Sequence, residues 1–347
     1  MSKIFFRIVV SFTLFLSNIA LADQLIVEPE MGREPLIKAI KQAKYSVNLV
    51  MYGFTDQTLL NAILAQKTKS LKIILERSPF RARDENTQTI RAFDQHHIDW
   101  QGSIPNYRLI HQKTLIIDDK QAIVMTFNFT HSTFKNTRNF ALVLDNPAQV
   151  REIKDAFNAD WNHKTVLGKS DEFIWSPDNS RTKLSNLILS SHYSLKIYAQ
   201  QISDYQIGGL LAKVARRGVT VQVLTSAQMP EKQSTYFSRN GVIIRHSKLY
   251  IHAKAMVIDN QTAVIGSTNL TRQSMDDNRE LSVVTHDKSV INGLNDTFSK
   301  DWQAADDRYL TNAGRSLSDK KMLRDGAKTL SLLINQLDSI YNKKTKH

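Results

Sequence analysis

The sequence has 347 residues, of which 41% are hydrophobic and 23% are charged, with 12 Gly and 7 Pro. This composition excludes a collagen-like or broadly disordered chain, and the length suits two domains of ordinary size. The formal net charge of +13 favours anionic partners, and the lack of cysteine excludes disulfides and thiol chemistry.

Residues 1–22 are predicted to be a signal peptide. Lys3 and Arg7 precede the apolar run IVVSFTLFLSNIALA, which ends in an A-x-A cleavage pattern at Ala22. The run is too short for a typical membrane-spanning helix. We expect cleavage after Ala22 and export to the periplasm or the medium, with an uncleaved N-terminal anchor as the alternative. Loss of Lys3 and Arg7 lowers the net charge from +13 to +11.

The following chain repeats itself. LIKAIKQAKYSVNLVMYGFTD at 36–56 matches LSNLILSSHYSLKIYAQQISD at 184–204, with an offset of 148 residues. After two variable loops, at 77–106 and 225–247, the offset becomes 141 and is kept to the end of the second copy. A fixed offset over this length indicates two copies of one structural unit. We therefore expect an N-terminal half at 23–165, a C-terminal half at 170–310 and a separate tail at 311–347.

Each half is predicted to combine helices with β-strands. The first half has the pattern of helices at 34–44 and 56–65 and of strands at 47–52, 71–75, 114–118, 122–127 and 140–145. The second half has helices at 182–192 and 204–217 and strands at 194–199, 219–224, 255–259, 262–267 and 281–286. Asp56 and Asp204 are the expected N-caps, and closing helices end at Trp161 and Trp302. This order predicts an α/β protein of two pseudo-symmetric α/β-sandwich halves, each a mixed sheet flanked by helices.

One motif occurs in both halves: IHQKTLIIDD at 110–119 and IHAKAMVIDN at 251–260. In a strand, alternation places His111 and Lys113 on one face, and His252 and Lys254 correspond to them. An ammonium group beside an imidazole can neutralise a phosphate oxygen while the ring supplies a nucleophilic or proton-donating nitrogen. The pattern therefore predicts a phosphate site in each motif.

Other polar residues recur at matching positions. Asp118 and Asp259 end the two motifs and are included among the candidate catalytic residues. By strand parity they face away from the lysines, which favours a structural role at a turn over direct chemistry. Further along, a hydroxyl residue and an Asn follow each motif. These candidates for substrate binding and catalysis are Thr126 and Asn128 in the first half and Ser267 and Asn269 in the second.

Two H-x-K-x(4)-D motifs, each followed by a hydroxyl-x-Asn element, resemble the phospholipase D superfamily. The resemblance implies that the halves pack face to face about a pseudo-twofold axis and form one active site without metal or other cofactor. It also implies a two-step transfer through a covalent phosphohistidine. In that chemistry Lys113, Lys254, Asn128 and Asn269 hold the non-bridging phosphate oxygens.

The resemblance also implies that each histidine is oriented by a side chain of the other half, Glu280 for His111 and Asn139 for His252. A carboxylate favours the cationic adduct more than an amide does, so His111 is the expected nucleophile and His252 the general acid. Two positions depart from the family pattern: Met125 replaces a Gly and Asn139 replaces a Glu, which suggests altered specificity or weaker turnover.

The substrate is left open between two phosphodiesters. We expect an exported phospholipase D-type enzyme that acts at a phospholipid membrane, with a nonspecific nuclease and a phosphatidyl transferase of cardiolipin synthase type as alternatives. Arg81, in the first variable loop, is a candidate for binding a second phosphate. With both motifs in one chain, a monomer is sufficient for a complete site.

Overall fold

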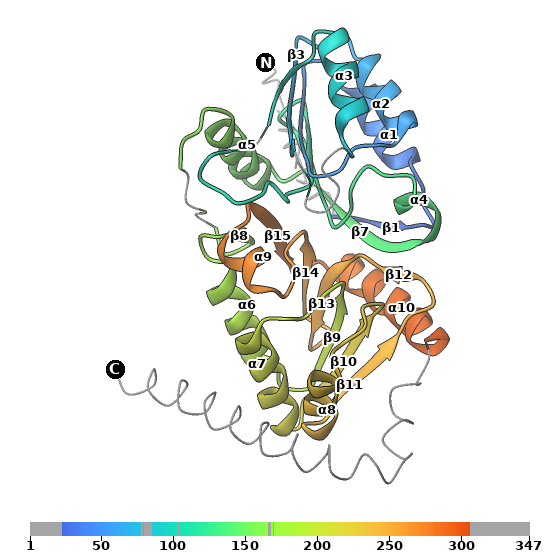
Figure 1. Ribbon diagram of the computed structural model, residues 1–347, viewed down its shortest axis with the longest axis vertical. Helices are drawn as coiled ribbons and strands as arrows, with labels where there is room; N and C mark the ends of the chain where they lie inside the picture. The colour runs from blue at the N-terminus through green and yellow to red at the C-terminus, as the bar shows by residue number, and fades with distance from the viewer. Residues whose placement is uncertain are drawn as a thin grey trace, which may run out of the picture.

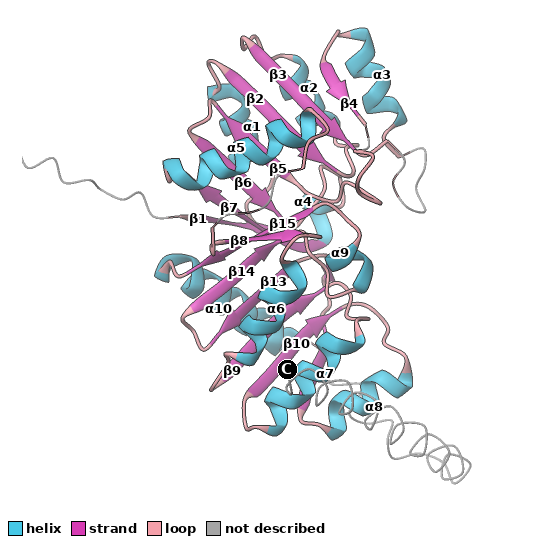
Figure 2. Ribbon diagram, turned by 90° about the vertical axis from the view of Figure 1, so that its left-hand side faces the viewer, coloured by secondary structure: helices cyan, strands magenta, loops and turns pink. Residues whose placement is uncertain are grey.

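The computed structural model describes residues 23–77, 79, 85–102, 104–165, 168 and 170–305. These residues form two mixed β-sheets with flanking helices, stacked along the longest axis of the molecule (Figures 1 and 2). The predicted α/β class with two similar halves is therefore confirmed. The expected signal peptide, Arg81 and the whole of the predicted tail at 311–347 lie outside the described residues.

The first half supplies seven strands and five helices to the described fold. They are β1 (Gln24–Glu28), α1 (Glu34–Gln42), β2 (Ser46–Met51), α2 (Gln57–Leu64), β3 (Ser70–Leu75), α3 (Thr87–Gln95), β4 (Asp99–Gln101), β5 (Thr114–Ile117), β6 (Gln121–Met125), α4 (Thr133–Asn136), β7 (Thr137–Leu144) and α5 (Pro147–Trp161).

The second half repeats this order, with one additional short strand, β12. Its elements are β8 (Phe173–Ser176), α6 (Ser180–Leu189), β9 (Ser194–Ala199), α7 (Tyr205–Arg216), β10 (Thr220–Thr225), α8 (Glu231–Arg239), β11 (Val242–His246), β12 (Tyr250–Ile251), β13 (Lys254–Ile258), β14 (Thr262–Gly266), α9 (Arg272–Asp276), β15 (Glu280–Thr285) and α10 (Lys288–Ala304). Among the described helices, none combines the length and the apolar character that a membrane crossing requires.

The two sheets have the same strand order. The first runs β1-β7-β6-β5-β2-β3-β4, and the second, read from the other edge, runs β8-β15-β14-β13-β9-β10-β11. In each sheet the last three strands are parallel and the others antiparallel. The motif strands β5 and β13 therefore lie in the middle of their sheets, where both faces are covered.

The described residues form three hydrophobic cores, one within each half and one between the halves. An outer core lies between the first sheet and α1, α2 and α3, and another lies between the second sheet and α6, α7 and α8. The central core takes apolar side chains from the inner faces of both sheets and from α5 and α10, so it belongs to both halves. Phe140 and Tyr198, for example, come from different halves, and their ring centroids are 5.1 Å apart.

The second helix of each half begins as predicted. Asp56 accepts a hydrogen bond from the Leu59 backbone N–H, and Asp204 accepts one from Ile207. Such a cap satisfies one of the free N–H groups at a helix start. Arg33 and Arg181, which are equivalent in the repeat, bind these two carboxylates and fix each helix to the segment before it.

The variable loops contain more structure than the sequence analysis predicts. Each holds a helix and an edge strand, α3 with β4 and α8 with β11. α3 buries only Thr89 and Phe93, and α8 buries only Phe237. These helices are amphipathic but polar on average, which makes them hard to tell from a polar loop in the sequence, and three- to five-residue edge strands give a weak pattern.

Candidate active site

The two histidine motifs meet at the boundary between the sheets because each is hydrogen-bonded to the other half. The backbone N–H groups of His111 and Gln112 both donate to the Arg279 carbonyl, at 2.9 Å. Likewise, His252 and Ala253 donate to the Arg138 carbonyl, at 3.2 and 3.0 Å. β12 pairs with β7 of the first sheet, and Ile110 forms the equivalent bridge to Arg279. Residues that are far apart in the sequence thus form one site.

Each imidazole is oriented by a side chain from the opposite half. His111 Nδ1 lies 2.8 Å from Glu280 Oε2, and His252 Nδ1 lies 3.0 Å from Asn139 Oδ1. Both pairings confirm the arrangement expected from the sequence. Because a carboxylate or amide oxygen only accepts, Nδ1 carries the hydrogen in each ring. Nε2 of each neutral imidazole therefore keeps the lone pair available for chemistry.

The two orienting side chains are themselves fixed. Glu280 is fully buried and accepts hydrogen bonds from the Ser274 hydroxyl and from Asn278 Nδ2, at 3.3 Å for the latter. Burial alone would raise the pKa of Glu280, but His111, Lys113 and Ser274 outweigh it, so the pKa lies below its ordinary value. Glu280 is therefore ionised at neutral pH.

Asn139 is held by two hydroxyl groups. Thr126 Oγ1 donates to Asn139 Oδ1 at 3.0 Å, and Asn139 Nδ2 donates to Thr137 Oγ1 at 2.8 Å. These contacts fix which end of the amide faces His252. His252 therefore has a neutral acceptor where His111 has a carboxylate.

Both lysines are buried beside their histidines. Lys113 Nζ donates to the His111 carbonyl at 2.5 Å and lies 5.2 Å from the centre of the Tyr52 ring. Lys254 Nζ donates to the His252 carbonyl at 2.5 Å and to Gln200 Oε1 at 2.7 Å. Burial lowers the pKa of Lys113 to about 7, with Glu280 and Glu85 opposing the shift. Burial and the charge of Lys113 lower the pKa of Lys254 well below its ordinary value.

The histidines are shifted in the same direction. Burial, together with the charges of Lys113 and Lys254, lowers the pKa of His111 to about 4, although Glu280 acts against the shift. Burial, Lys254, Lys113 and His111 lower the pKa of His252. Each motif therefore acts electrostatically on the other. The site thus combines two neutral imidazoles with two buried lysines whose charged forms are disfavoured. A bound phosphate anion would stabilise the charged lysines.

The motif aspartates lie away from this centre. Asp118 accepts hydrogen bonds from the backbone N–H groups of residues 44–46, and Asp259 does the same for residues 192–194. Each aspartate follows the far end of its motif strand, where it enters the hairpin turn to the next strand. The catalytic assignment of the two aspartates is thereby corrected, and the structural role that strand parity favours fits their contacts.

The two asparagines and the two hydroxyl residues have different surroundings. Asn128 and Asn269 are half-buried beside the site, and neither Oδ1 has a hydrogen-bond partner among the described residues. The hydroxyls of Thr126 and Ser267 are instead fully buried and bind the neighbouring strand, at Phe140 N and Leu281 N respectively. The assignment of Thr126 and Ser267 as substrate-binding residues is therefore corrected, because both hydroxyls are engaged inside the protein.

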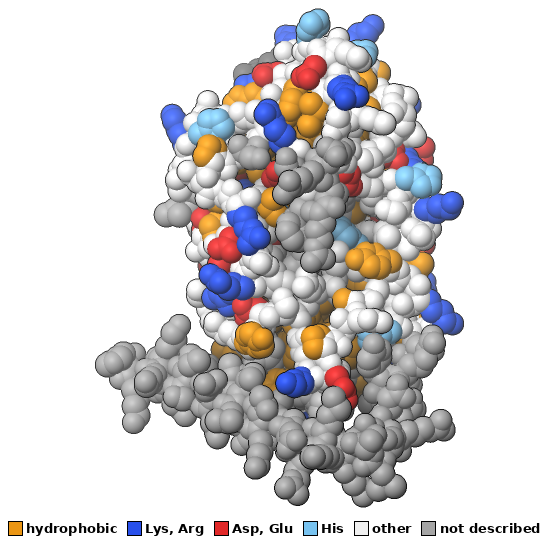
Figure 3. Space-filling view, viewed as in Figure 1, with side chains coloured by type: hydrophobic (Ala, Val, Ile, Leu, Met, Phe, Trp, Pro, Cys, Tyr) orange, Lys and Arg blue, Asp and Glu red, His pale blue; other side chains and the backbone are white. Residues whose placement is uncertain are grey.

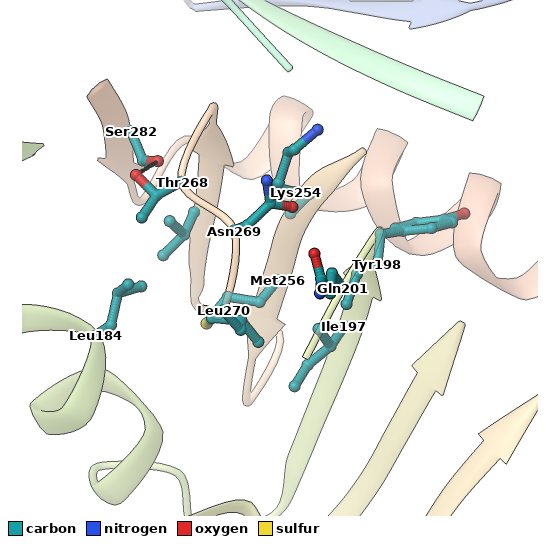
Figure 4. Close-up of a pocket in the computed structure, with 13 residues that line it drawn as sticks. Leu184, Ile197, Tyr198, Gln201, Lys254, Met256, Thr268, Asn269, Leu270 and Ser282 are labelled. Atoms are coloured by element: carbon teal, nitrogen blue, oxygen red, sulfur yellow. Dashed lines mark hydrogen bonds between the residues drawn. The ribbon is translucent and has the colours of Figure 1, made fainter. Parts of the chain in front are cut away.

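A small cavity of about 20 Å³ lies under the second motif, where a single water molecule would fit. Figure 4 shows Thr268 and Ser282 side by side at one part of its wall, while the amine of Lys254 points away from the apolar side chains of Met256 and Leu270. Phe127 and Ala141 stand at the equivalent positions of the first half. Met125, the departure from the expected Gly, packs in the outer core there.

A larger open pocket of about 580 Å³ lies beside His252. Its described lining is mainly hydroxyl, amide and imidazole side chains: Thr55, Glu85, Asn128, Thr130, His131, Ser132, Thr133, Asn136, Thr137, Tyr250 and His252.

Among the described residues, no group of three or more His, Asp or Glu side chains is arranged to hold a metal ion. Arg77, from the loop that also contains Arg81, is exposed and stacks on Trp100, with 5.4 Å from its guanidinium carbon to the ring centre.

Two arginines that the sequence analysis does not single out connect the halves. Arg138 Nε donates to Asp301 at 2.7 Å, and Arg279 Nε donates to Asp160 at 2.9 Å. Each pair joins a strand of one half to the closing helix of the other. The sequence does contain a signal for them, since Arg and Asp both recur at the offset of 141. Each arginine also precedes the side chain that orients a histidine.

Comparisons with known proteins agree with this geometry. Residues 36–161 and 184–302 match a family model described as "Cardiolipin synthase, PLD-like domain". A cardiolipin synthase from Listeria innocua is 24% identical over 330 residues, which cover 80% of this chain and 68% of that protein. A mitochondrial cardiolipin hydrolase from Mus musculus is 25% identical over 134 residues, covering 37% of this chain and 61% of its own length. The crystal structure of phosphatidylserine synthase from Haemophilus influenzae has the same fold, with a TM-score of 0.66 and 10% identity over 89% of this chain and 94% of its own.

Proposed function

We propose that this chain, which belongs to the phospholipase D-like family, hydrolyses phospholipids. In this proposal it acts as a phosphodiesterase and forms a covalent phosphohistidine. The observation that carries the proposal is the pair of imidazoles, each with Nδ1 held by the opposite half and each beside a buried lysine. This arrangement supplies a nucleophile, a proton carrier and charge neutralisation for one phosphorus atom.

In the first step, His111 Nε2 attacks phosphorus, and the bond from phosphorus to the alcohol oxygen breaks. His252, which takes up a proton at Nε2 when the anionic substrate binds, gives this proton to the departing oxygen, so a free alcohol leaves and a phosphorus–nitrogen bond remains. Glu280 stabilises the positive charge that develops on the His111 ring, since its carboxylate lies 2.8 Å from Nδ1. The neutral Asn139 gives His252 no such stabilisation, which suits a ring that must release its proton.

In the second step, His252 accepts a proton from water, and the resulting oxygen nucleophile breaks the phosphorus–nitrogen bond. Phosphatidic acid leaves, and both histidines return to their starting states. Lys113 and Lys254 would neutralise the non-bridging oxygens in both steps, with Asn128 and Asn269 as donors from the two sides. An alcohol in place of water would give transfer instead of hydrolysis.

A phospholipid substrate is supported by the named activities of the relatives, which include a cardiolipin synthase, a cardiolipin hydrolase and a phosphatidylserine synthase. On the face drawn in Figure 3, basic, acidic and hydrophobic side chains of the described residues are interspersed. The positive charge therefore does not form a continuous basic stripe on that face, as a track for a nucleic-acid backbone would require.

Export is a separate part of the proposal. It rests on the signal-peptide pattern of residues 1–22, in which Lys3 and Arg7 precede an apolar run that ends at Ala22. Sequencing the N-terminus of the protein recovered from a periplasmic or culture fraction tests it, with Asp23 expected as the first residue.

The activity is tested with protein pretreated with EDTA. Labelled vesicles of phosphatidylcholine and phosphatidylglycerol are compared with plasmid and single-stranded DNA, using the wild type, His111→Ala and His252→Ala. We expect headgroup release by the wild type only, and a phosphatidyl adduct on the peptide that contains His111 after quenching in mildly alkaline detergent, in which the phosphorus–nitrogen bond is stable. DNA cleavage without headgroup release would identify a nuclease instead. An adduct on the peptide that contains His252 would reverse the two histidine roles.

A further inference from the structure

The open pocket beside His252 has a carboxylate that the two-step mechanism does not use. Glu85 lines this pocket, and it is the only carboxylate among the described lining residues. Most of the remaining lining consists of uncharged hydrogen-bonding groups, together with the exposed Tyr250 ring, which is 49% accessible. A volume of about 580 Å³ is far larger than one water molecule needs, so the pocket has room for a polar organic group.

Glu85 is held in place by its neighbour. Asn86 is fully buried, its Oδ1 accepts from Phe54 N at 2.7 Å, and its Nδ2 donates to the carbonyls of Tyr52 at 2.8 Å and Glu76 at 2.7 Å. Tyr52 and Phe54 follow the end of β2, and Glu76 follows the end of β3, its parallel neighbour in the first sheet. The backbone next to Glu85 is therefore fixed to the same strand ends that form the floor of the site.

The side chain of Glu85 approaches the catalytic groups across Gly53. A Cβ added at Gly53 would lie 3.2 Å from Glu85 Oε1 and 3.2 Å from Asn128 Nδ2, so the absence of a side chain lets both groups lie close to the Gly53 backbone. The charge of Lys113 acts on Glu85. Burial raises the pKa of the Glu85 carboxyl, and Lys113 opposes that shift, so Lys113 helps to keep the carboxylate charged.

We propose that this pocket is the subsite for the alcohol part of the substrate, and that Glu85 selects the alcohol by its charge. The inference rests on the proposed function, in which His252 protonates the departing alcohol and deprotonates the incoming nucleophile. An alcohol whose reacting hydroxyl lies at His252 directs the rest of the molecule into this pocket. A nearby ammonium group would bind Glu85, a second hydroxyl would donate a hydrogen bond to it, and an anionic group would be repelled.

The expected order of preference is therefore amino alcohol, then neutral diol, then hydroxy acid. The test uses three small acceptors of equal length that differ only in their terminal group: ethanolamine, ethylene glycol and glycolate. Each is added at the same concentration to mixed vesicles of phosphatidylcholine and phosphatidylglycerol. Mass spectrometry then measures each transfer product relative to phosphatidic acid, the hydrolysis product. This partition ratio compares acceptors on one covalent intermediate, so it does not depend on the overall rate.

For the wild type we expect ethanolamine to exceed glycolate by about tenfold, as expected for one partly exposed charge contact. Glu85→Gln should bring the two acceptors to within about twofold, and Glu85→Asp should keep the order because it keeps the charge. Glu231→Gln, which removes an exposed carboxylate at the start of α8, is the matched control and should leave the ratio unchanged.

Two results would overturn the inference in different ways. If Glu85→Gln slows transfer to all three acceptors equally and keeps their ratio, Glu85 only balances the charge of Lys113, and the pocket does not select by charge. If the wild type forms neither phosphatidic acid nor any transfer product, the proposed function itself is wrong, and the alcohol subsite is lost with it.

Discussion

At the scale of single residues, the protonation of the site depends on whether an anion is bound. His111 and Lys113 are both buried, and burial disfavours their charged forms. Glu280 is the carboxylate that binds His111 directly, and it compensates only part of this cost. A bound phosphodiester supplies a negative charge beside the two lysines and so stabilises their charged forms. Substrate binding is therefore expected to be coupled to proton uptake by the site. The free enzyme should have the active protonation state only over a limited pH range.

The pH dependence of kcat/KM tests this charge balance, because that ratio reports the ionisable groups of the free enzyme. His111 must be neutral to attack phosphorus, and its pKa is lowered to about 4, so activity should rise as the pH increases through 4. His252 must be protonated and Lys113 must be charged, so the fall in activity that begins above the lowered pKa of His252 should become steeper as the pH increases through about 7, the pKa of Lys113. Initial rates on vesicles between pH 3 and 10 measure both limbs.

Lys113→Arg is the matching variant for the alkaline limb. A guanidinium group stays charged throughout this range, so the fall near pH 7 should move to higher pH or disappear, even if the maximal rate is reduced. A fall that stays near pH 7 in this variant would assign the limb to another group, and Lys254 would be the first to examine.

Several residue identities in the site are readable from the sequence, and several contacts are not. The His-Lys pairs recur at a fixed offset, so the repeat identifies them, whereas the two orienting residues follow from the resemblance to the phospholipase D superfamily. The direction of a hydroxyl is different. Thr126 and Ser267 come directly after the last residues of β6 and β14, and whether such a hydroxyl faces a substrate or the next strand depends on backbone geometry beyond the strand end. Glu85 belongs to a variable loop that has no repeat to compare with.

At the scale of elements, the aspartates of the motif stabilise two hairpins. Asp118 and Asp119 have φ values of 53°, and the Lys120 N–H donates to the Ile117 carbonyl, as in a type I′ turn. Asp259 and Asn260 form the equivalent turn. Each aspartate carboxylate also ties its turn to the segment that connects a helix to a central strand, β2 or β9. The hairpins therefore fix the far ends of the strands whose near ends present the histidines.

Asp118→Asn and Asp259→Asn should each lower the free energy of unfolding by about 1–3 kcal/mol, since the charged acceptor shared by three backbone N–H groups becomes neutral. Burial raises the pKa of Asp118, but the N–H donors outweigh it and the pKa lies below 3.8. The stabilisation is therefore present above pH 3.8 and is lost as the pH falls through the lower, folded-state pKa. Urea unfolding at several pH values measures this.

The control for these variants is Asp119→Asn in the same turn. Its carboxylate binds Lys154 at the surface and is half exposed, so the expected change is below about 1 kcal/mol. All three variants should keep vesicle hydrolysis within a few-fold of wild type at temperatures where they are folded. A loss of turnover without a loss of stability in Asp118→Asn would return this residue to the catalytic set.

The elements that the sequence predicts well are those with many buried positions. The helices near 56–65 and 204–217 appear as α2 and α7 within one residue at each end, because each has an N-cap and a wide apolar face. The closing helices also follow from the repeated Trp. The edge strands and α3 and α8 bury few residues, and the two helices are polar on average, so their sequences resemble those of polar loops.

At the scale of the whole molecule, neither half can form the site alone. The orienting residue of each histidine, and the strand that carries its backbone hydrogen bonds, come from the other half. The central core is likewise shared between both sheets and the two closing helices. We therefore expect the described fold to unfold in a single cooperative transition, in which loss of the interface and loss of activity coincide.

The contribution of the buried ion pairs to this interface can be measured at Arg279 and Asp160. Arg279 is fully buried, donates to Asp160 at 2.9 Å, and stacks on Trp175 with 4.6 Å from its guanidinium carbon to the ring centre. Arg279→Met leaves the Asp160 carboxylate buried without its partner, which should cost about 3–5 kcal/mol of unfolding free energy. The double variant Arg279→Met with Asp160→Leu removes both charges, so it should regain most of that loss. Because residue 279 binds the His111 motif through its backbone carbonyl, the double variant should also regain vesicle hydrolysis. If it stays as unstable as the single variant, the other contacts of the guanidinium, with Tyr107 of the first half and with Trp175 and Asp178 of the second, contribute more than its ion pair with Asp160.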